Sequence, residues 1–308
     1  MQLFQICLLA LISISEAAPA PYNIQVTVSS ASHFGVRSCD SYYSSPFAGF
    51  SCEVNQTVPR EDLCCVETPN GVVMQTQFWD YAPSYVNGTG PSNHTAVNQD
   101  NISGMGPANN VFTIHGLWND KCDGTYNQFC NDALEVDASD LETIIAEQFN
   151  DRPLYNKMKQ IWVNTQNSNV QDGGSESLWE HEYNKHGTCM TTLQPRCYEG
   201  NYQQYQTAYD FYRRVVEIWD TLPTYEFLAN AEIYPSANQT YSLTDFQEAL
   251  AQNHGGQVYV GCVSGNIVSE IWYYHHVKGN VLTGELKPID TLTNSTCKSS
   301  QIRYLPKY

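Results

Sequence analysis

The segment 178–189 concentrates side chains that can move protons and hold a fixed positive charge. It reads L-W-E-H-E-Y-N-K-H-G-T-C and places His181, Glu182, Lys185 and His186 within six residues. On an α-helix these positions fall at roughly 0°, 100°, 40° and 140° around the axis, so one side would present all four. Phosphoryl chemistry needs this combination of proton carriers and a cation. The alternative is a solvated polar helix face followed by a structural cysteine.

A further histidine follows an apolar run at residues 112–120, which read F-T-I-H-G-L-W-N-D. The run predicts a strand that delivers His115 beside a glycine and a large aromatic residue. A lone histidine at a strand end is usually structural. Because the chain has two separate histidine segments, we favour a catalytic role, in which one histidine donates a proton and the other accepts one.

Together the two segments resemble the motifs of the ribonuclease T2 family, the base-nonspecific acid ribonucleases with H-G-L-W and W-x-H-E-x-x-K-H-G-T-C. Both motifs are complete here, and the resemblance extends from Cys39 to Cys297, with the fungal branch most similar. The chain departs from the pattern at Asn119, where proline is frequent, and at Tyr183, where tryptophan is frequent. Neither position carries a proton transfer, so the departures affect local packing and base preference.

The resemblance implies an endoribonuclease that acts on single-stranded RNA with little base specificity and without a metal or other cofactor. In such enzymes the 2′-hydroxyl attacks the adjacent phosphorus, and the resulting 2′,3′-cyclic phosphate is hydrolysed to a 3′-phosphate. The implied roles are base for His186, acid for His115, phosphate contact for His181, and transition-state stabilisation for Lys185 and Glu182. Which of the first two histidines gives the proton and which takes it stays open.

The resemblance also implies a base pocket formed by Trp118, Asp120 and Tyr126. An aromatic face accepts any base, while a carboxylate accepts a hydrogen bond from an exocyclic amino group. This combination gives base preference without strict specificity. The alternative for the two aromatic residues is ordinary core packing.

Two other function classes compete with this interpretation. A zinc hydrolase would need the H-E-x-x-H spacing, whereas His181 and His186 are five residues apart and point about 140° apart on a helix. The second class is a catalytically weak secreted defence or glycan-binding glycoprotein on the same scaffold. It is disfavoured because every expected catalytic position is filled.

The first 17 residues predict a cleaved secretory signal, because an apolar stretch too short to span a bilayer is followed by small residues. Removal of Cys7 from the 11 cysteines leaves an even number, which predicts five disulfides in an oxidising compartment. Cysteine counting alone permits about 945 pairings. The family resemblance implies one of them: Cys39 with Cys65, Cys52 with Cys122, Cys64 with Cys197, Cys130 with Cys189, and Cys262 with Cys297.

We expect a secreted or vacuolar-lysosomal glycoprotein that is a monomer and does not associate with membranes. The N-glycosylation sequons are at Asn55, Asn87, Asn93, Asn101, Asn238 and Asn294. The 15 basic and 32 acidic residues give a net charge of −17 at pH 7, which repels RNA. This repulsion would weaken if the protein acts at acidic pH, because carboxylates are then neutralised and histidines become cationic.

We expect a single α+β ribonuclease domain over residues 18–308, with its motif-bearing core at 39–297 and a glycosylated loop at 83–110. Strands are predicted at 72–79, 111–115, 258–263 and 267–277. Helices are predicted at 140–149, 154–162, 177–186, 202–219 and 245–253, the third with a capping box from Ser177 and Glu180 and a stop at Gly187. Strands and helices do not alternate regularly, which favours a central antiparallel sheet packed by helices.

Overall fold

The computed structural model describes residues 34–46, 48–53, 63–81, 110–164, 174–200 and 202–307. The expected signal at 1–17 and the expected glycosylated loop at 83–110, apart from Asn110, lie outside these residues. So do the sequons at Asn55, Asn87, Asn93 and Asn101. The sequons at Asn238 and Asn294 are described, and both asparagines are exposed.

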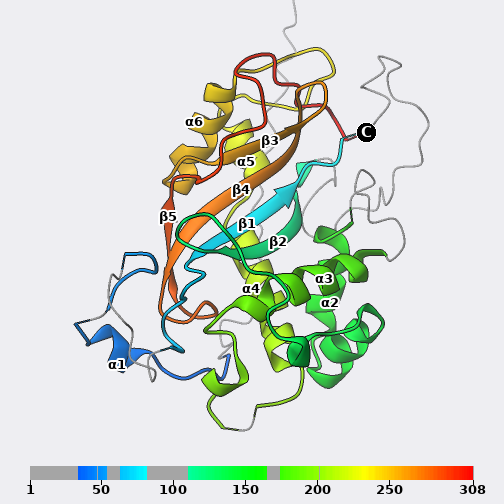
Figure 1. The fold of residues 1–308 in the computed structure, drawn as a ribbon. Helices are drawn as coiled ribbons and strands as arrows, with labels where there is room; N and C mark the ends of the chain where they lie inside the picture. The colour runs from blue at the N-terminus through cyan, green and yellow to red at the C-terminus, as the bar shows by residue number, and fades with distance from the viewer. Residues whose placement is uncertain are drawn as a thin grey trace, which may run out of the picture.

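A twisted antiparallel sheet forms the centre of the molecule (Figure 1). Its strands are β1 (Val72–Phe78), β2 (Thr113–Asp120), β3 (Tyr259–Val263), β4 (Ile267–Lys278) and β5 (Glu285–Ile289). The strand order is β2-β1-β4-β3, and β5 also pairs with β4. The predicted single α+β domain with an antiparallel sheet is confirmed.

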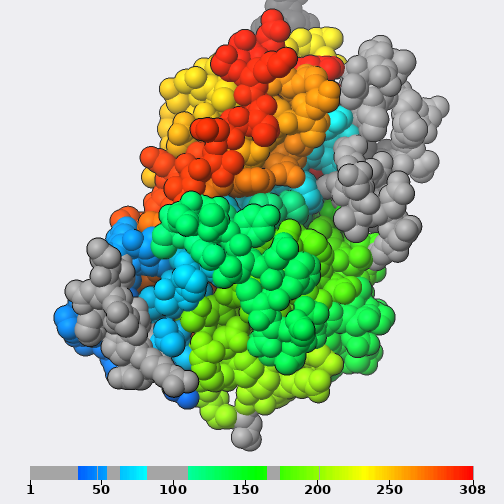
Figure 2. Space-filling model, viewed as in Figure 1, coloured from blue at the N-terminus to red at the C-terminus, as the bar shows by residue number. Residues whose placement is uncertain are grey.

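The helices are α1 (Asp40–Tyr43), α2 (Arg152–Ile161), α3 (Gly174–Lys185), α4 (Gln206–Asp220), α5 (Thr224–Ala229) and α6 (Leu243–His254). Helix α3 packs against β2, α4 against β1 and β2, and α6 against β3. The residues after β2, in green, lie across the middle of the space-filling view, below the orange and red C-terminal part (Figure 2).

The two faces of the sheet bury different sets of side chains, because successive residues of a strand point in opposite directions. Val73 of β1 belongs to the large core that the helices cover. Val72 and Met74 belong to a smaller cluster with Tyr259 and Tyr274. This smaller cluster lies beside Trp118 and Trp272, and the candidate site lies next to it.

Several predicted boundaries are wrong. The strand predicted at 111–115 begins at Thr113 and continues to Asp120, because its whole length pairs with β1. The helix predicted at 140–149 consists of a 3-10 turn at Ala138–Asp140 and a π-helical segment at Thr143–Gln148. The helix predicted at 202–219 begins only at Gln206, because Tyr205 has a left-handed backbone with φ of 66°.

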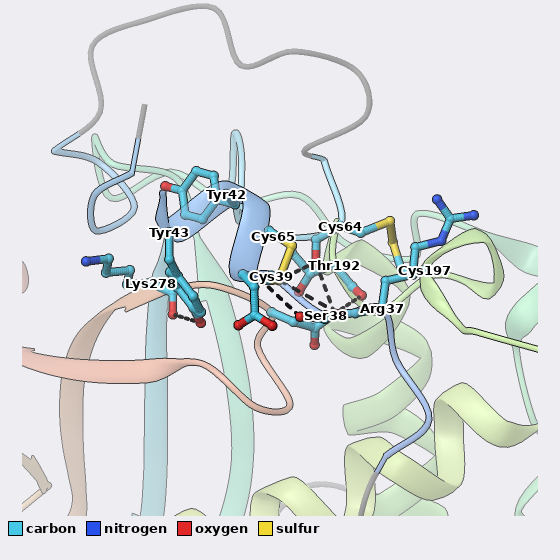
Figure 3. The surroundings of a disulfide bond; sticks show 12 residues. Arg37, Ser38, Cys39, Tyr42, Tyr43, Cys64, Cys65, Thr192, Cys197 and Lys278 are labelled. Carbon is cyan, nitrogen blue, oxygen red and sulfur yellow. Dashed lines mark hydrogen bonds between the residues drawn. A yellow bond between two sulfur atoms is a disulfide. The ribbon is translucent and has the colours of Figure 1, made fainter. Parts of the chain in front are cut away.

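Five disulfides join the described segments with the predicted pairing, which is therefore confirmed. The adjacent Cys64 and Cys65 have different partners (Figure 3). Cys65 joins Cys39 next to α1, and Cys64 joins Cys197 at the end of the 3-10 helix Pro195–Cys197. One short stretch thus connects the N-terminal segment to the region that follows α3.

Candidate active site

His115 lies in β2, at the edge of the sheet, with 18% of its side chain exposed. Its ring stacks on Phe78 of the neighbouring strand at 3.9 Å and 19°. The indole nitrogen of Trp162 donates a 2.8 Å hydrogen bond to the backbone carbonyl of His115, which holds this part of the strand. Burial lowers the pKa of His115 to about 3, and the charges of Lys185 and His181 act in the same direction.

Glu182 projects from α3 toward β2 and is 1% exposed. Its Oε1 lies 3.5 Å from His115 Nε2, and its Oε2 accepts a 2.7 Å hydrogen bond from Trp118 Nε1. Burial raises the pKa of Glu182 to about 8, although the hydrogen bond from Trp118 and the charge of Lys185 oppose the shift. At mildly acidic pH, Glu182 is therefore a neutral acid next to a neutral histidine.

Gly116 explains how a helix carboxyl can approach the strand so closely. A Cβ atom at this position would lie 1.8 Å from Glu182 Oε2 and 2.7 Å from its Cδ. A side chain of any kind there would occupy the space of the Glu182 carboxyl. The glycine of the H-G-L-W segment and the acid of the second motif are thus complementary in volume.

His186 lies just beyond α3, which ends at Lys185, and before the 3-10 helix Gly187–Cys189. It is 3% exposed, and neither ring nitrogen has a hydrogen-bond partner among the described residues. Burial lowers its pKa to about 2, and the charge of Lys185 adds to the effect.

Trp118 connects the two histidines. Its ring stacks on His186 at 5.2 Å and 19° and meets the His115 ring edge-on at 4.9 Å and 82°. The same indole donates its N–H to Glu182. One aromatic ring therefore contacts three of the predicted catalytic side chains.

The predicted helix at 177–186 is nearly correct, but its predicted beginning and capping box are wrong. Helix α3 begins at Gly174, so Ser177 is not its cap, and Glu180 instead accepts a hydrogen bond from Ala138 N at 3.2 Å. The predicted stop agrees with the structure to within one residue, because α3 ends at Lys185 and Gly187 starts the next 3-10 helix.

The four side chains of this motif do not share one exposed face. Glu182 and His186 are buried, Lys185 is half-buried, and His181 is exposed beside the ring of Phe129. The cation of Lys185 nevertheless lies close enough to act on both neighbours. Burial and the charge of Lys185 lower the pKa of His181, and the same charge opposes the burial that raises the pKa of Glu182. The group acts as one electrostatic unit around a buried carboxyl.

The predicted base pocket extends from the end of β2. Asp120 pairs through its backbone with Tyr126, and the turn between them is closed by a 2.7 Å hydrogen bond from Lys121 N to Thr125 O. Tyr126 is 58% exposed. Burial raises the pKa of Asp120 to about 7, with Lys185 opposing the shift. Below neutral pH this carboxyl can both donate and accept hydrogen bonds.

Two site residues of β4, Glu270 and Trp272, were missed by the sequence interpretation. Glu270 Oε1 lies 3.8 Å from His115 Nδ1, and Trp272 packs edge-on against Trp118 at 5.0 Å. A signal was present, because an acid in an apolar aromatic strand at 267–277 is unusual. Position 272, two residues after Glu270 and so on the same face of the strand, is a tryptophan. In the described part of the chain, no group of three or more acidic, histidine or cysteine side chains is arranged to hold a metal ion.

Comparison with known proteins identifies clear relatives. A family model described as Ribonuclease T2 family matches residues 70–297. Ribonuclease T2 of Aspergillus oryzae is 39% identical over 259 residues, which cover 84% of this chain and 82% of that protein. Ribonuclease T2-like 1-A of Candida albicans is 39% identical over 275 residues, or 88% of this chain, but this chain spans only 61% of its length.

A solved structure shares the same fold. The crystal structure of Actibind, a T2 ribonuclease, superimposes with a TM-score of 0.70 at 37% sequence identity. The match covers 89% of this chain and 98% of that one.

Proposed function

The chain belongs to the ribonuclease T2 family, and from this premise we propose that it is a secreted acid endoribonuclease that cleaves single-stranded RNA with little base specificity. The observation that carries the proposal is the convergence of His115, Glu182 and His186 around Trp118. Two histidines that contact one ring can act as base and acid on opposite sides of a phosphodiester.

In the first step, His186 removes the proton of the 2′-hydroxyl, whose oxygen then attacks the adjacent phosphorus. His115 gives a proton to the 5′-oxygen as the bond from phosphorus to that oxygen breaks, which leaves a 2′,3′-cyclic phosphate. In the second step a water molecule replaces the leaving alcohol, and the two histidines exchange roles. No metal is needed, because both proton transfers and the charge stabilisation come from side chains.

The raised pKa of Glu182 removes a difficulty of this mechanism. A charged carboxylate would repel the anionic phosphorane, whereas a protonated carboxyl donates a hydrogen bond to it. The phosphate charge in turn favours the cationic form of His115, whose Nε2 lies 3.5 Å from the Glu182 carboxyl. Lys185 supplies the fixed cation, and the exposed His181 contacts the phosphate.

The base pocket of Trp118, Asp120 and Tyr126 accounts for low base specificity. Exposed Tyr126 offers a stacking surface, which every base can use. Protonated Asp120 can donate to a ring nitrogen or accept from an amino group, so several bases satisfy it.

The test of the proposal is cleavage of a single-stranded RNA oligonucleotide and of the same oligonucleotide with one 2′-deoxy residue at the main cleavage site. Cleavage at that site should vanish in the second substrate, and cyclic phosphate ends should accumulate before 3′-phosphates. A chelator should leave the rate unchanged. Cleavage of the deoxy site, or loss of activity with chelator and recovery with zinc, would reject the mechanism. No cleavage of either substrate would favour a non-catalytic glycoprotein.

We expect a bell-shaped pH profile with its maximum near pH 4 to 6, below the usual histidine pKa of about 6.5. Burial lowers the pKa of His115 and of His186, so both limbs move to lower pH than for exposed histidines. The net charge of −17 at pH 7 adds a binding penalty for long RNA that shrinks as carboxylates protonate. pH profiles are measured with a dinucleotide and with long RNA, each at two salt concentrations. The dinucleotide mainly reports the titration of the histidines, whereas long RNA also reports the charge repulsion, which depends on salt. Maxima above neutrality for both substrates would contradict the acid assignment.

The variant Gly116→Ala is expected to lower kcat about 10- to 10²-fold, because the new methyl group displaces the Glu182 carboxyl from Trp118 and His115. The measurement is steady-state kinetics together with thermal unfolding. Gly124→Ala is the matched control, because a Cβ at Gly124 would meet no atom within 4 Å. Gly124 has a backbone φ of 79°, so this control should lose some stability but keep its activity. Equal activity of the two variants would show that the volume at Gly116 is unimportant.

The remaining parts of the proposal concern processing and assembly. Ten cysteines paired in five disulfides are typical of an oxidising compartment, which supports entry into the secretory pathway through a signal at 1–17. We propose one monomeric ribonuclease domain over 18–308, with N-glycans on some of the six sequons. No helix in the described ranges is long and apolar enough to cross a membrane.

A further inference from the structure

The His115 ring faces a carboxyl group on each side. Glu182 Oε1 lies 3.5 Å from Nε2, and Glu270 Oε1 lies 3.8 Å from Nδ1. His115 Nδ1 is buried and has no hydrogen-bond partner among the described residues. A buried, unpartnered ring nitrogen that faces a carboxyl at this distance needs only a small movement to form a hydrogen bond.

Glu270 is itself held in place. Trp272 Nε1 donates a 2.9 Å hydrogen bond to Glu270 Oε2, which leaves Oε1 directed at His115. The Trp272 ring stacks on Tyr259 at 4.0 Å and 24°. Glu270 is also the cross-strand partner of Phe78, on which the His115 ring stacks. The contacts of the His115 ring therefore come from β1, β4 and α3 together.

We propose that Glu270 is a positioning residue, which accepts the Nδ1 proton of His115 and so directs Nε2 toward the leaving 5′-oxygen. The inference rests on the proposed ribonuclease function. When the bond from phosphorus to the 5′-oxygen breaks, Nε2 gives its proton to that oxygen, and Nδ1 keeps its proton in the hydrogen bond to Glu270. A carboxylate behind the imidazole fixes its tautomer and stabilises its cation, as in other histidine sites with an acidic partner. Such hydrogen bonds are often long in an empty site and shorten with substrate.

The charges around His115 set the direction of the expected pH effect. Lys185 and His181 of α3 favour its neutral form, and so does His186 just beyond α3 when it is protonated. Glu182 of α3 is itself protonated at acidic pH, and the β1 residue stacked on His115 is the uncharged Phe78. Burial raises the pKa of Glu270 and the hydrogen bond from Trp272 opposes that shift; once ionised, Glu270 favours the imidazolium. Activity requires protonated His115, so it falls as pH rises through the pKa of this group. Loss of the Glu270 charge should therefore move the basic limb to lower pH.

The test compares Glu270→Gln and Glu270→Asp with Glu285→Gln, which removes one negative charge from an exposed position of β5 in the same sheet. Glu270→Gln should lower kcat about 10- to 10²-fold with little change in KM and move the basic limb down by about one pH unit. Glu270→Asp should restore part of both effects. Glu285→Gln should match the parent protein.

Titration of His115 by NMR in histidine-labelled protein gives a readout that does not depend on turnover. Its pKa should fall in Glu270→Gln and stay unchanged in Glu285→Gln. An unchanged His115 pKa, or a loss of kcat with the basic limb in place, would overturn the positioning role. If the parent protein cleaves no RNA, the proposed function fails, while the titration still decides the contact. If Glu270→Gln does not fold, Trp272→Phe removes the donor to Glu270 and keeps an aromatic ring beside Tyr259 and Trp118. It should give the same shifts at smaller size.

Discussion

Alanine at His186 or at His115 is expected to lower kcat at least about 10²-fold, because each replacement removes one positioned proton transfer. His186 is buried, and its two ring nitrogens have no hydrogen-bond partner within the described residues, so no hydrogen-bond network is lost with it. His186→Phe keeps a ring against Trp118 and separates the loss of chemistry from the loss of packing. The measurement is kcat and KM on a dinucleotide near the pH maximum, with circular dichroism to verify the fold.

The control for these variants is His276→Ala, a histidine of β4 that contacts Glu53 and lies outside the site. Its side chain is 16% exposed and its contact is with Glu53, so its kcat should stay within about twofold of the parent value. The double variant of His115 and His186 should be scarcely slower than either single one, because groups that act as a unit are not additive. Near-normal kcat in either folded single variant would remove that histidine from the chemistry.

Replacement of both Cys130 and Cys189 by serine is expected to lower the free energy of unfolding by about 2 to 5 kcal/mol and to impair turnover. This disulfide closes a sequence separation of 59 residues and joins the segment after the base pocket to the end of the 3-10 helix that follows α3. Two hydrogen bonds support the junction, from Phe129 N to Lys185 O at 3.0 Å and from Cys130 N to Thr188 Oγ1 at 3.0 Å. Two hydrogen bonds are too few to hold this junction without the disulfide, so Lys185 should lose its fixed position.

The matched control removes Cys262–Cys297, which closes a separation of 35 residues away from the histidines. The chain-entropy relation predicts a loss of about 4 kcal/mol for either disulfide. Denaturant unfolding should therefore place the two double variants close together, whereas kcat at low temperature should fall only in the Cys130 and Cys189 variant. A similar kcat for both would mean that this junction does not position the site.

The long elements were predictable from the sequence because their signals are local. Strand β4 is rich in β-branched and aromatic residues, and α6 begins after Ser242, whose side chain accepts a hydrogen bond from Asp245 N. The short elements α1 and α5 and the strand β5 were not predicted. The stability of α1 depends on a neighbouring disulfide, and β5 contains Pro288, which is unusual inside a strand. Their stability comes from tertiary contacts, which a local pattern does not contain.

The candidate site was only partly predictable for the same reason. The two motifs were predicted to form one site, and in the structure they lie together, because His115 of β2 contacts Glu182 of α3. The burial of His186 and the contact of Glu270 with His115 were missed, because each depends on the register between distant segments. Strand pairing places Glu270 beside Phe78, and nothing near Glu270 in the chain indicates that partner.

The two adjacent cysteines Cys64 and Cys65 have a consequence for how the chain matures. The disulfide between Cys65 and Cys39 closes a loop with a sequence separation of 26 residues. If Cys39 paired with Cys64 instead, that separation would change by a single residue. In an unfolded chain the correct and the exchanged pairings therefore have almost equal entropy, and only native packing distinguishes them. Oxidative folding should pass through mispaired species that require thiol–disulfide exchange, so the yield of active protein depends on an isomerase or a suitable redox buffer.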